Sequence, residues 1–489
     1  MKALLVSLFL ILVLQGGAEG NLLQVKAAFH VHTNLSTGAL SLEEVVEEAR
    51  MEGIDSVIFA ENFLLRFEYG LFPFRGLLKK VVEEPSVVRQ GIRQWLRSIE
   101  AAQTKFPDVI LIPGVEVMPY YYWDGSPFRG DLTLWDAQKN LLAVGIDKAE
   151  DYLRIPAVGN GRSLSPQQPH VLTSALGLAL VGVGIFLVQT GRDKRIRLKH
   201  GVLTGQKWYR VPGWLALGIG TLFLFEAFSA SELNPYMGDL GIGPYQRVID
   251  SFEATGGMVF WSFPEARDLR QEAFGPLSTV TIRTDPHPEV LLQSHGYTGF
   301  GAVYQDNVTF TEPGGEWDQL LLEYMEGRRT RPAWAIGELG YHGPSKRLGD
   351  ILTVFLVPQR SRGEILQALK LGRFYSVQRL PDYRLVLEDF SIGQKGRQEW
   401  IPMGGELEAD GGGPLWIRLR ISASDGREVP FALRLIHSGR LLHTIQGRTP
   451  FAETLKVSPP DRGMGEFFRV DVVKPHRLLS NPIFIRRQV

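Results

Sequence analysis

Two long apolar segments near the middle of the chain constrain its fold more than any other feature. They cover residues 171–189 and 211–228, and the one charged side chain within them is Glu226, near the end of the second segment. About 20 predominantly apolar residues are enough for a helix to cross the hydrocarbon core of a bilayer. A buried helix of a soluble core is the alternative, but two segments of this length favour a transmembrane helical hairpin.

The connector between the two segments, residues 190–210, indicates the orientation of that hairpin. It contains seven lysine and arginine residues and a single acidic residue, Asp193. Short loops with this excess of positive charge stay in the cytoplasm. We therefore expect a basic cytoplasmic loop, with both large flanking parts of the chain on the extracytoplasmic (periplasmic) side.

Residues 1–20 indicate how the first flank reaches that side. Lys2 precedes an apolar run over residues 3–14, and a stretch of small residues follows the run. This order is typical of a secretory signal peptide, and the apolar run is too short to span a bilayer. The sequence thus predicts an exported protein held at the cell membrane.

Composition narrows the chemistry of the exported parts. Lysine plus arginine, at 53, equals aspartate plus glutamate, at 53, so no overall basic field attracts a nucleic-acid backbone, and nucleic acid is excluded as the main partner. The chain has no cysteine, which excludes thiol nucleophiles, zinc–thiolate sites, iron–sulfur clusters and disulfides. Any metal must therefore be held by histidine, aspartate and glutamate.

The exported parts divide by pattern into an α/β domain and an all-β domain. Residues 21–165 and 232–380 alternate short β-rich runs with helical patterns, which is typical of βα units around a parallel sheet or barrel. The apolar hairpin interrupts this one domain. Residues 381–489 contain strand patterns and turn signals alone, which predicts a small C-terminal β-sandwich.

Candidate site residues stand where the strand-like runs of the α/β domain end. His30 and His32 close the first run two positions apart, so both side chains are expected on one side. In βα barrels, metals and substrates bind at the C-terminal ends of the strands. An isolated H-x-H pair is as often structural, but acidic groups and a third histidine end other runs here: Glu61, Glu116, Glu338 and His342.

The motifs around these residues resemble those of the PHP (polymerase and histidinol phosphatase) superfamily of metal-dependent phosphoesterases. FHVHTNLSTG is similar to the first family motif, and GIDSVIFAEN, IPGVEV and AIGELGYHG are similar to later ones. The tail FFRVDVV…LLSNPIFI resembles the terminal sandwich of the carbaryl-hydrolase-like branch. The resemblance implies a distorted (β/α)7 barrel, here interrupted by the transmembrane hairpin and followed by the sandwich.

The resemblance also implies a divalent metal site, with His30, His32, Glu116 and His342 as ligands and Glu116 as the bridging carboxylate. Several customary ligands are replaced, by Glu61 and Asn62 in the second motif and at three further positions: Asn140, Phe263 and Gly340. We therefore expect one ion, zinc or manganese, in place of the two- or three-metal cluster of the family. Glu338 and Asn62 are candidate surrogate ligands, and Glu61 is a candidate general base.

Three readings of the function remain open from the sequence. The first is a membrane-tethered, extracytoplasmic hydrolase of a small-molecule phosphate ester or other ester, with a reduced one-metal site. The second is a catalytically degenerate PHP-like binding or sensing module. A structural anchor that presents the sandwich to another envelope protein is a third reading. Glycines along the apolar segments permit close helix packing, and hence a homodimer formed through the membrane.

Overall fold

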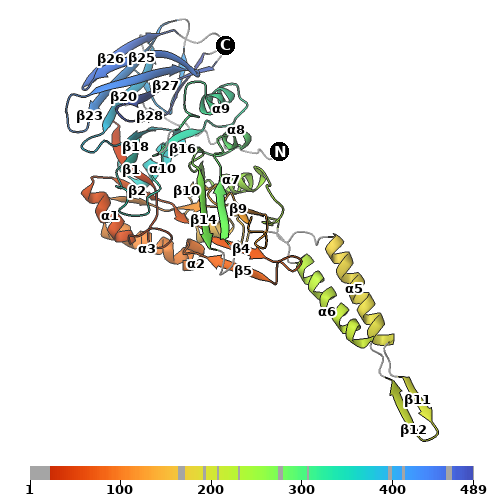
Figure 1. Cartoon of the computed structure of the whole chain (residues 1–489). Coiled ribbons are helices and arrows are strands. Elements are labelled where there is room, and N and C mark those ends of the chain that lie inside the picture. Colours follow the sequence, from red (N-terminus) through yellow and green to blue (C-terminus); the bar gives the residue numbers. More distant parts are fainter. Residues whose placement is uncertain are drawn as a thin grey trace, which may run out of the picture.

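The structure is a computed structural model of the whole chain. It describes residues 22–163, 171–190, 194–205, 209–228, 232–273, 279–305, 308–394, 399–409, 413–458 and 465–487. The predicted signal segment, residues 1–20, lies outside the described residues. Figure 1 shows an α/β body, a group of C-terminal strands at one end of it, and a pair of helices that projects from the other end.

The first sheet of the α/β body contains the strand that ends in the two histidines. Strand β1 (Leu23–Val31) lies between β18 (Ile351–Val357), to which it is antiparallel, and β2 (Ser56–Phe59), to which it is parallel; β6 (Ile110–Ile112) follows parallel to β2. Helix α1 (Leu42–Met51) begins at a capping box formed by Ser41 and Glu44, and its apolar side chains Leu42, Val45, Val46 and Ala49 are buried.

The second sheet has six strands in the order β17-β16-β13-β10-β7-β3. Their bounds are β3 (Glu61–Asn62), β7 (Gly114–Val117), β10 (Leu141–Val144), β13 (Met258–Trp261), β16 (Gly299–Val303) and β17 (Trp334–Gly337). Strand β10 is antiparallel to both of its neighbours, and the other pairs are parallel. An isolated parallel bridge pairs Val31 of β1 with Tyr341, which follows the end of β17. The fold is thus mixed α/β, and closure into a (β/α)7 barrel stays a prediction.

Seven further helices accompany these strands in the described part of the body. They are α2 (Val87–Gln90), α3 (Ile92–Lys105), α4 (Ala149–Leu153), α7 (Gly243–Thr255), α8 (Val290–Gln293), α9 (Glu316–Met325) and α10 (Arg362–Leu371). Two small sheets lie toward the helix pair (Figure 1). One is the hairpin of β4 (Arg66–Gly70) and β5 (Lys79–Glu83); the other has the order β14-β15-β9-β8, with β8 (Tyr122–Asp124), β9 (Thr133–Trp135), β14 (Asp268–Ala273) and β15 (Thr279–Thr284).

The C-terminal strands extend the first sheet of the body instead of starting apart from it. Strand β19 (Phe374–Gln378) pairs with β18 and with β28 (Leu478–Ser480), and the sheet continues through β27 (Gly465–Lys474), β29 (Ile483–Arg487) and β22 (Glu406–Ala409). Strands β24 (Pro430–His437) and β25 (Arg440–Arg448) branch from β27. A separate sheet has the order β21-β20-β23-β26, with β20 (Leu385–Gln394), β21 (Trp400–Pro402), β23 (Leu415–Ala423) and β26 (Phe451–Val457). The predicted boundary near residue 380 is therefore crossed by a continuous sheet.

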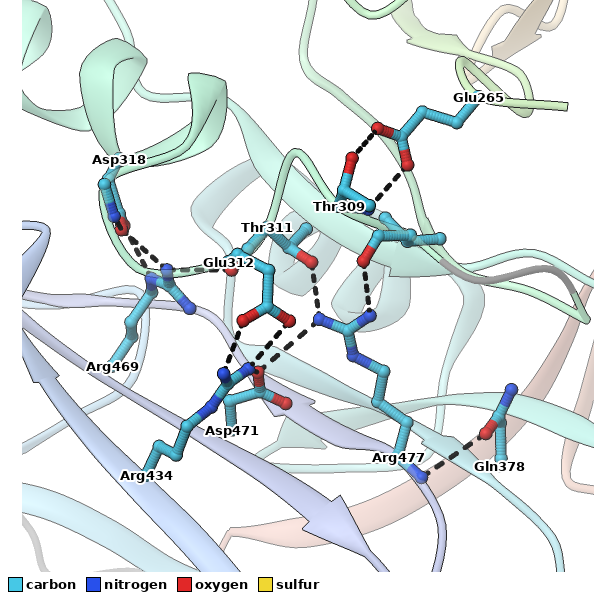
Figure 2. A network of polar contacts seen from close by, with 12 residues as sticks. Glu265, Thr309, Thr311, Glu312, Asp318, Gln378, Arg434, Arg469, Asp471 and Arg477 are labelled. Atoms are coloured by element: carbon cyan, nitrogen blue, oxygen red, sulfur yellow. Dashed lines mark hydrogen bonds and ion pairs between the residues drawn. The ribbon is translucent and has the colours of Figure 1, made fainter. Parts of the chain in front are cut away.

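Buried charges hold the C-terminal strands to the body (Figure 2). Arg469 of β27 donates to both carboxylate oxygens of Asp318 in α9, each at 2.7 Å, and both side chains are almost fully buried. Nearby, Arg434 and Arg477 share the carboxylate of Asp471, and Arg434 also binds Glu312 of the body. Because an unpaired buried charge is very costly, these pairs make the two parts depend on each other.

Both predicted apolar segments form helices, α5 (Val171–Thr190) and α6 (Arg210–Phe228), which pack against each other in antiparallel directions. A Cβ added at Gly177 would lie 3.0 Å from the carbonyl oxygen of Gly220, so the absence of a side chain permits this close approach. Among the described helices, α5 is long and apolar enough to cross a membrane. The connector forms strands β11 (Lys194–Leu198) and β12 (Gly201–Gly205). Membrane insertion and its orientation stay predictions.

Candidate metal centre

A strained turn of the backbone places the two histidines at the end of β1. His30 has a φ of 69°, in the left-handed region that L residues seldom adopt, and the pairing of β1 with β2 shifts register between Phe29 and Val31. Backbone strain of this kind persists where the surrounding structure holds it, often at functional sites. The result is that the Nε2 atoms of His30 and His32 face each other at 2.9 Å.

Glu116, in β7 of the second sheet, completes a triangle of ligand atoms. Its Oε1 lies 3.6 Å from His30 Nε2, and its Oε2 lies 3.6 Å from His32 Nε2. All three side chains are buried, and their ligand atoms lie within 4.8 Å of one another. Donors around a tetrahedral ion with bonds of about 2.0–2.1 Å are about 3.4 Å apart. The residues present therefore fit a divalent ion.

Glu338 lies at the Nδ1 edge of the His30 ring, away from the triangle of ligand atoms. Its Oε1 is 2.7 Å from His30 Nδ1, and its carboxylate also accepts hydrogen bonds from the Ser262 hydroxyl at 2.5 Å and the Phe263 amide at 3.0 Å. A Cβ at Gly301 would stand 1.7 Å from Glu338 Oε2, so glycine makes room for this carboxylate. Glu338 thus contacts Nδ1 of His30. The other ring nitrogen, Nε2, faces His32 and Glu116.

Charge interactions within the triangle are strong because the groups are buried. Burial opposes ionisation of His30 and of Glu116. It is outweighed by their mutual attraction together with the contacts of Glu338 to His30 and of His32 and Asn140 to Glu116, so the pKa of His30 rises to about 9 and the pKa of Glu116 falls to about 2. Burial, and then the charge of His30, lower the pKa of His32 well below its usual value. Without an ion, the site therefore holds one charged imidazole, one neutral imidazole and one carboxylate.

Glu61 is fully buried beside this triangle, but its contacts are with the loop that follows β1. One oxygen accepts from the amide of Thr33 at 3.0 Å and from its hydroxyl at 2.5 Å, and the other accepts from the hydroxyl of Ser36. Ser36 Oγ is in turn 3.3 Å from His32 Nδ1. Burial raises the pKa of Glu61 to about 7. Sequence reasoning missed Thr33 and Ser36, although both stand in the first motif.

Two asparagines stand at positions where the resemblance implies histidine ligands. Asn62 Nδ2 donates to Glu116 Oε2 at 2.8 Å, and Asn140 Nδ2 donates to Glu116 Oε1 at 2.9 Å. The side-chain oxygen of Asn62 accepts from Thr37 Oγ1 at 2.7 Å. The side-chain oxygen of Asn140 is buried and has no hydrogen-bond partner within the described residues, which is the condition of an atom that a bound water or ligand satisfies.

Phe263 and Gly340 stand at two further positions where the resemblance implies metal ligands, and the two residues are in close contact. The ring of Phe263 stacks on that of His30, with the centroids 5.3 Å apart. A Cβ at Gly340, where φ is 57°, would lie 2.9 Å from Cζ of Phe263. The Phe263 ring therefore occupies space that a side chain at position 340 would need.

His342 lies at the outer edge of the centre. Its ring stacks on that of His32 with 4.2 Å between centroids, its Nδ1 is 3.1 Å from Thr37 Oγ1, and its side chain is exposed. The structure thus brings His30, His32 and Glu116 together at one point and arranges the other candidates around them. The ligand roles of His342, Glu338 and Asn62 stay predictions.

Comparison with known proteins gives similarity to solved structures alone. No protein-family profile matches the chain, and no curated protein matches it. One similar structure is a two-domain protein from Bacteroides vulgatus that contains a predicted PHP-like metal-dependent phosphoesterase, with 12% identity, a TM-score of 0.34 and 95% of each chain covered.

Two other similar structures cover less of the chain. A candidate metal-dependent phosphoesterase from Bifidobacterium adolescentis has 15% identity and a TM-score of 0.27, over 65% of this chain and 88% of that one. An amidohydrolase from Chromobacterium violaceum, with bound sulfate and no metal, has 11% identity and a TM-score of 0.26, over 66% of this chain and 89% of that one.

Proposed function

We propose that this chain is a membrane-tethered, extracytoplasmic metal-dependent hydrolase that cleaves small-molecule phosphate esters with a site for one divalent ion. The observation that carries the proposal is the convergence of His30, His32 and Glu116, three buried side chains whose ligand atoms lie within 4.8 Å of one another. Two imidazoles and a carboxylate suit zinc or manganese. The motif resemblance to the PHP superfamily supports the same reaction class.

The protein's contribution to catalysis is the orientation of its ligands. A divalent ion, when bound, supplies the Lewis acidity that polarises a phosphoryl oxygen and activates water. Glu338 accepts a hydrogen bond from Nδ1–H of His30, so Nε2 is the nitrogen that would face the ion. Glu61 acts on His32 at one remove, through the hydroxyl of Ser36. Such partners fix the ring of a ligating histidine and make its other nitrogen more basic.

The replaced positions support one ion over a larger cluster. Asn62 and Asn140 direct amide N–H groups at both oxygens of Glu116, and an N–H group is not a metal ligand. Phe263 covers His30 with an apolar ring. A second ion that would clamp the leaving oxygen has lost its customary ligands, so the reaction depends on a single Lewis acid.

The same replacements favour a second candidate, a catalytically degenerate binding or sensing module. In that case the hydrogen bonds from Asn62 and Asn140 stabilise a carboxylate that no longer binds an ion. This candidate differs from the first in a measurable way, because it predicts no stoichiometric metal.

Elemental analysis joined to an activity assay separates the two candidates. The full chain is purified in detergent, incubated with zinc or manganese, desalted, and assayed on p-nitrophenyl phosphate and bis(p-nitrophenyl) phosphate. We expect about one bound ion per chain and hydrolysis for the wild type and for His295→Ala, an exposed control, and neither for His32→Ala. No bound ion and no turnover would contradict the hydrolase and favour the binding module. A bound ion without turnover would leave the metal site and exclude phosphoesterase activity on these esters.

The tether is tested separately from the chemistry. Helix α5 is predominantly apolar and contains no charged residue, and the connector to α6 is basic. We expect the chain to stay in the membrane pellet after alkaline carbonate extraction, and a C-terminal tag to be cleaved by protease added outside the inner membrane. Release by carbonate would contradict the tether, and a protected tag would contradict the orientation.

A further inference from the structure

The tip of the β4–β5 hairpin, residues 71–78, exposes an unusual amount of apolar surface. Phe72 is 81% exposed and Leu78 is 57% exposed, and Leu71 and Leu77 are exposed beside them. Scattered apolar residues on a protein surface are ordinary, but several on one short tip mark an interaction site.

This tip contacts the helix pair. The carboxylate of Glu226, in the last turns of α6, accepts from the amide of Gly76 at 2.8 Å and 2.9 Å, and the ring of Phe74 packs on Phe223 with the centroids 5.1 Å apart. Figure 1 shows β4 and β5 on the side of the body from which α5 and α6 project. The exposed tip therefore lies level with the end of the apolar helices that is closest to the body.

The tip is held in place by its backbone and its stem. The amide of Leu71 donates to the carbonyl of Leu78 at 2.8 Å, and that of Leu78 donates to the carbonyl of Phe74 at 2.8 Å. In the stem, Phe67 packs on Tyr121 and Tyr69 packs on Trp123. The apolar side chains thus project from an ordered support, and the cost of ordering them on binding is small.

We propose that the tip inserts into the outer leaflet of the membrane that α5 and α6 cross, and that it docks the α/β body on the lipid surface. This inference rests on the tether proposed above. A carboxylate such as Glu226 is costly inside hydrocarbon and belongs near the interface. A tip bonded to that carboxylate is at the same depth, where apolar and aromatic side chains enter the boundary between headgroups and acyl chains.

The absence of cysteine makes a direct test possible, because one introduced cysteine takes a label at one place. Phe72→Cys in the full chain is labelled with a nitroxide and reconstituted in liposomes of phosphatidylcholine and phosphatidylglycerol. Collision with oxygen, which concentrates in lipid, is compared with collision with a water-soluble nickel chelate. Leu178→Cys, 62% exposed on α5, is the lipid control, and Met51→Cys, 81% exposed on α1, is the aqueous control.

We expect the label at position 72 to resemble the label at position 178 and to differ from the label at position 51. Suppose that the label at position 178 is in lipid but the label at position 72 collides with the nickel chelate as often as the label at position 51. This result would overturn the docking and leave the tether standing. Aqueous labels at both 72 and 178 would overturn the tether as well. A label at 72 shielded from both reagents would also overturn the docking, in favour of contact with a second copy of the chain.

Discussion

Oε1 of Glu338 lies 2.7 Å from Nδ1 of His30, while Nε2 of the same ring lies 2.9 Å from Nε2 of His32. The two nitrogens of one imidazole therefore have separate tasks, one toward a buried carboxylate and one toward the candidate ion. This arrangement explains why Glu338, which the sequence nominates as a surrogate ligand, approaches the histidine from the opposite side.

Replacement of Glu338 by glutamine tests this division. The amide keeps the size of the side chain but no longer carries the negative charge that holds the Nδ1 proton, so we expect zinc affinity to fall about 10- to 100-fold. Competition with a chromogenic chelator measures the change. Glu47→Gln on the exposed face of α1 is the control. Unchanged affinity in Glu338→Gln would mean that this contact does not orient a ligand.

The contact between Phe263 and position 340 predicts a coupled pair of substitutions. Gly340→Ala places a Cβ 2.9 Å from Cζ of Phe263 at a φ of 57°, and we expect a loss of about 1–3 kcal/mol from steric conflict and backbone strain. In a Phe263→Ala background the steric part disappears, so the loss should be smaller. Chemical denaturation of the four members of the cycle measures the coupling. Equal losses in both backgrounds would show that the two residues do not compete for space.

The buried pair of Arg469 and Asp318 predicts strong dependence of the C-terminal strands on the body. Arg469→Met leaves the carboxylate of Asp318 buried without its partner, and we expect a loss of about 3–5 kcal/mol in unfolding free energy. Arg448→Met breaks the exposed pair with Glu428 and should cost less than about 1 kcal/mol. Comparable losses in the two variants would contradict a special role for the buried pair.

His287 predicts a loss of stability in acid. Burial lowers its pKa to about 4, whereas an unfolded histidine titrates near 6.5. Between these values the unfolded chain binds the additional proton, so stability present at neutral pH is lost as the pH falls, by up to about 1.4 kcal/mol per pH unit. His287→Asn, which keeps a donor for the carbonyl of Asp285, should have a shallower dependence on pH from 7 to 5, and the exposed His295→Asn should not. Identical slopes in all three proteins would contradict the assignment.

Much of the local structure could be predicted from the sequence because short-range patterns determine it. The strand before His30 and His32, the capped helix at Ser41 and the helical form of both apolar segments all follow from residues within one element. The group of His30, His32 and Glu116 could be identified from the sequence for a related reason, since all three stand on or at the ends of buried strands.

The rest depended on contacts between distant segments. Glu338 contacts the Nδ1 edge of His30 because His30 has a left-handed φ and because the Ser262 hydroxyl holds the Glu338 carboxylate. Neither feature is visible in the periodicity of the sequence. The continuation of the body's sheet from β19 into β28 joins Tyr375 to Ser480. Pairings over such separations are set by the packing of the complete chain, and patterns within one segment do not reveal them.

The insertion of the helix pair between β10 and β13 has a consequence for the order of assembly. Val144 pairs with Met258 in adjacent strands, but both helices and their connector are synthesised between them. At a synthesis rate of about 5–20 residues per second, β13 is completed on the order of ten seconds after β10. During that interval the strand has an unpaired edge, which is a site for incorrect pairing and aggregation. The newly made amino-terminal half therefore exposes this edge until the second half has been synthesised.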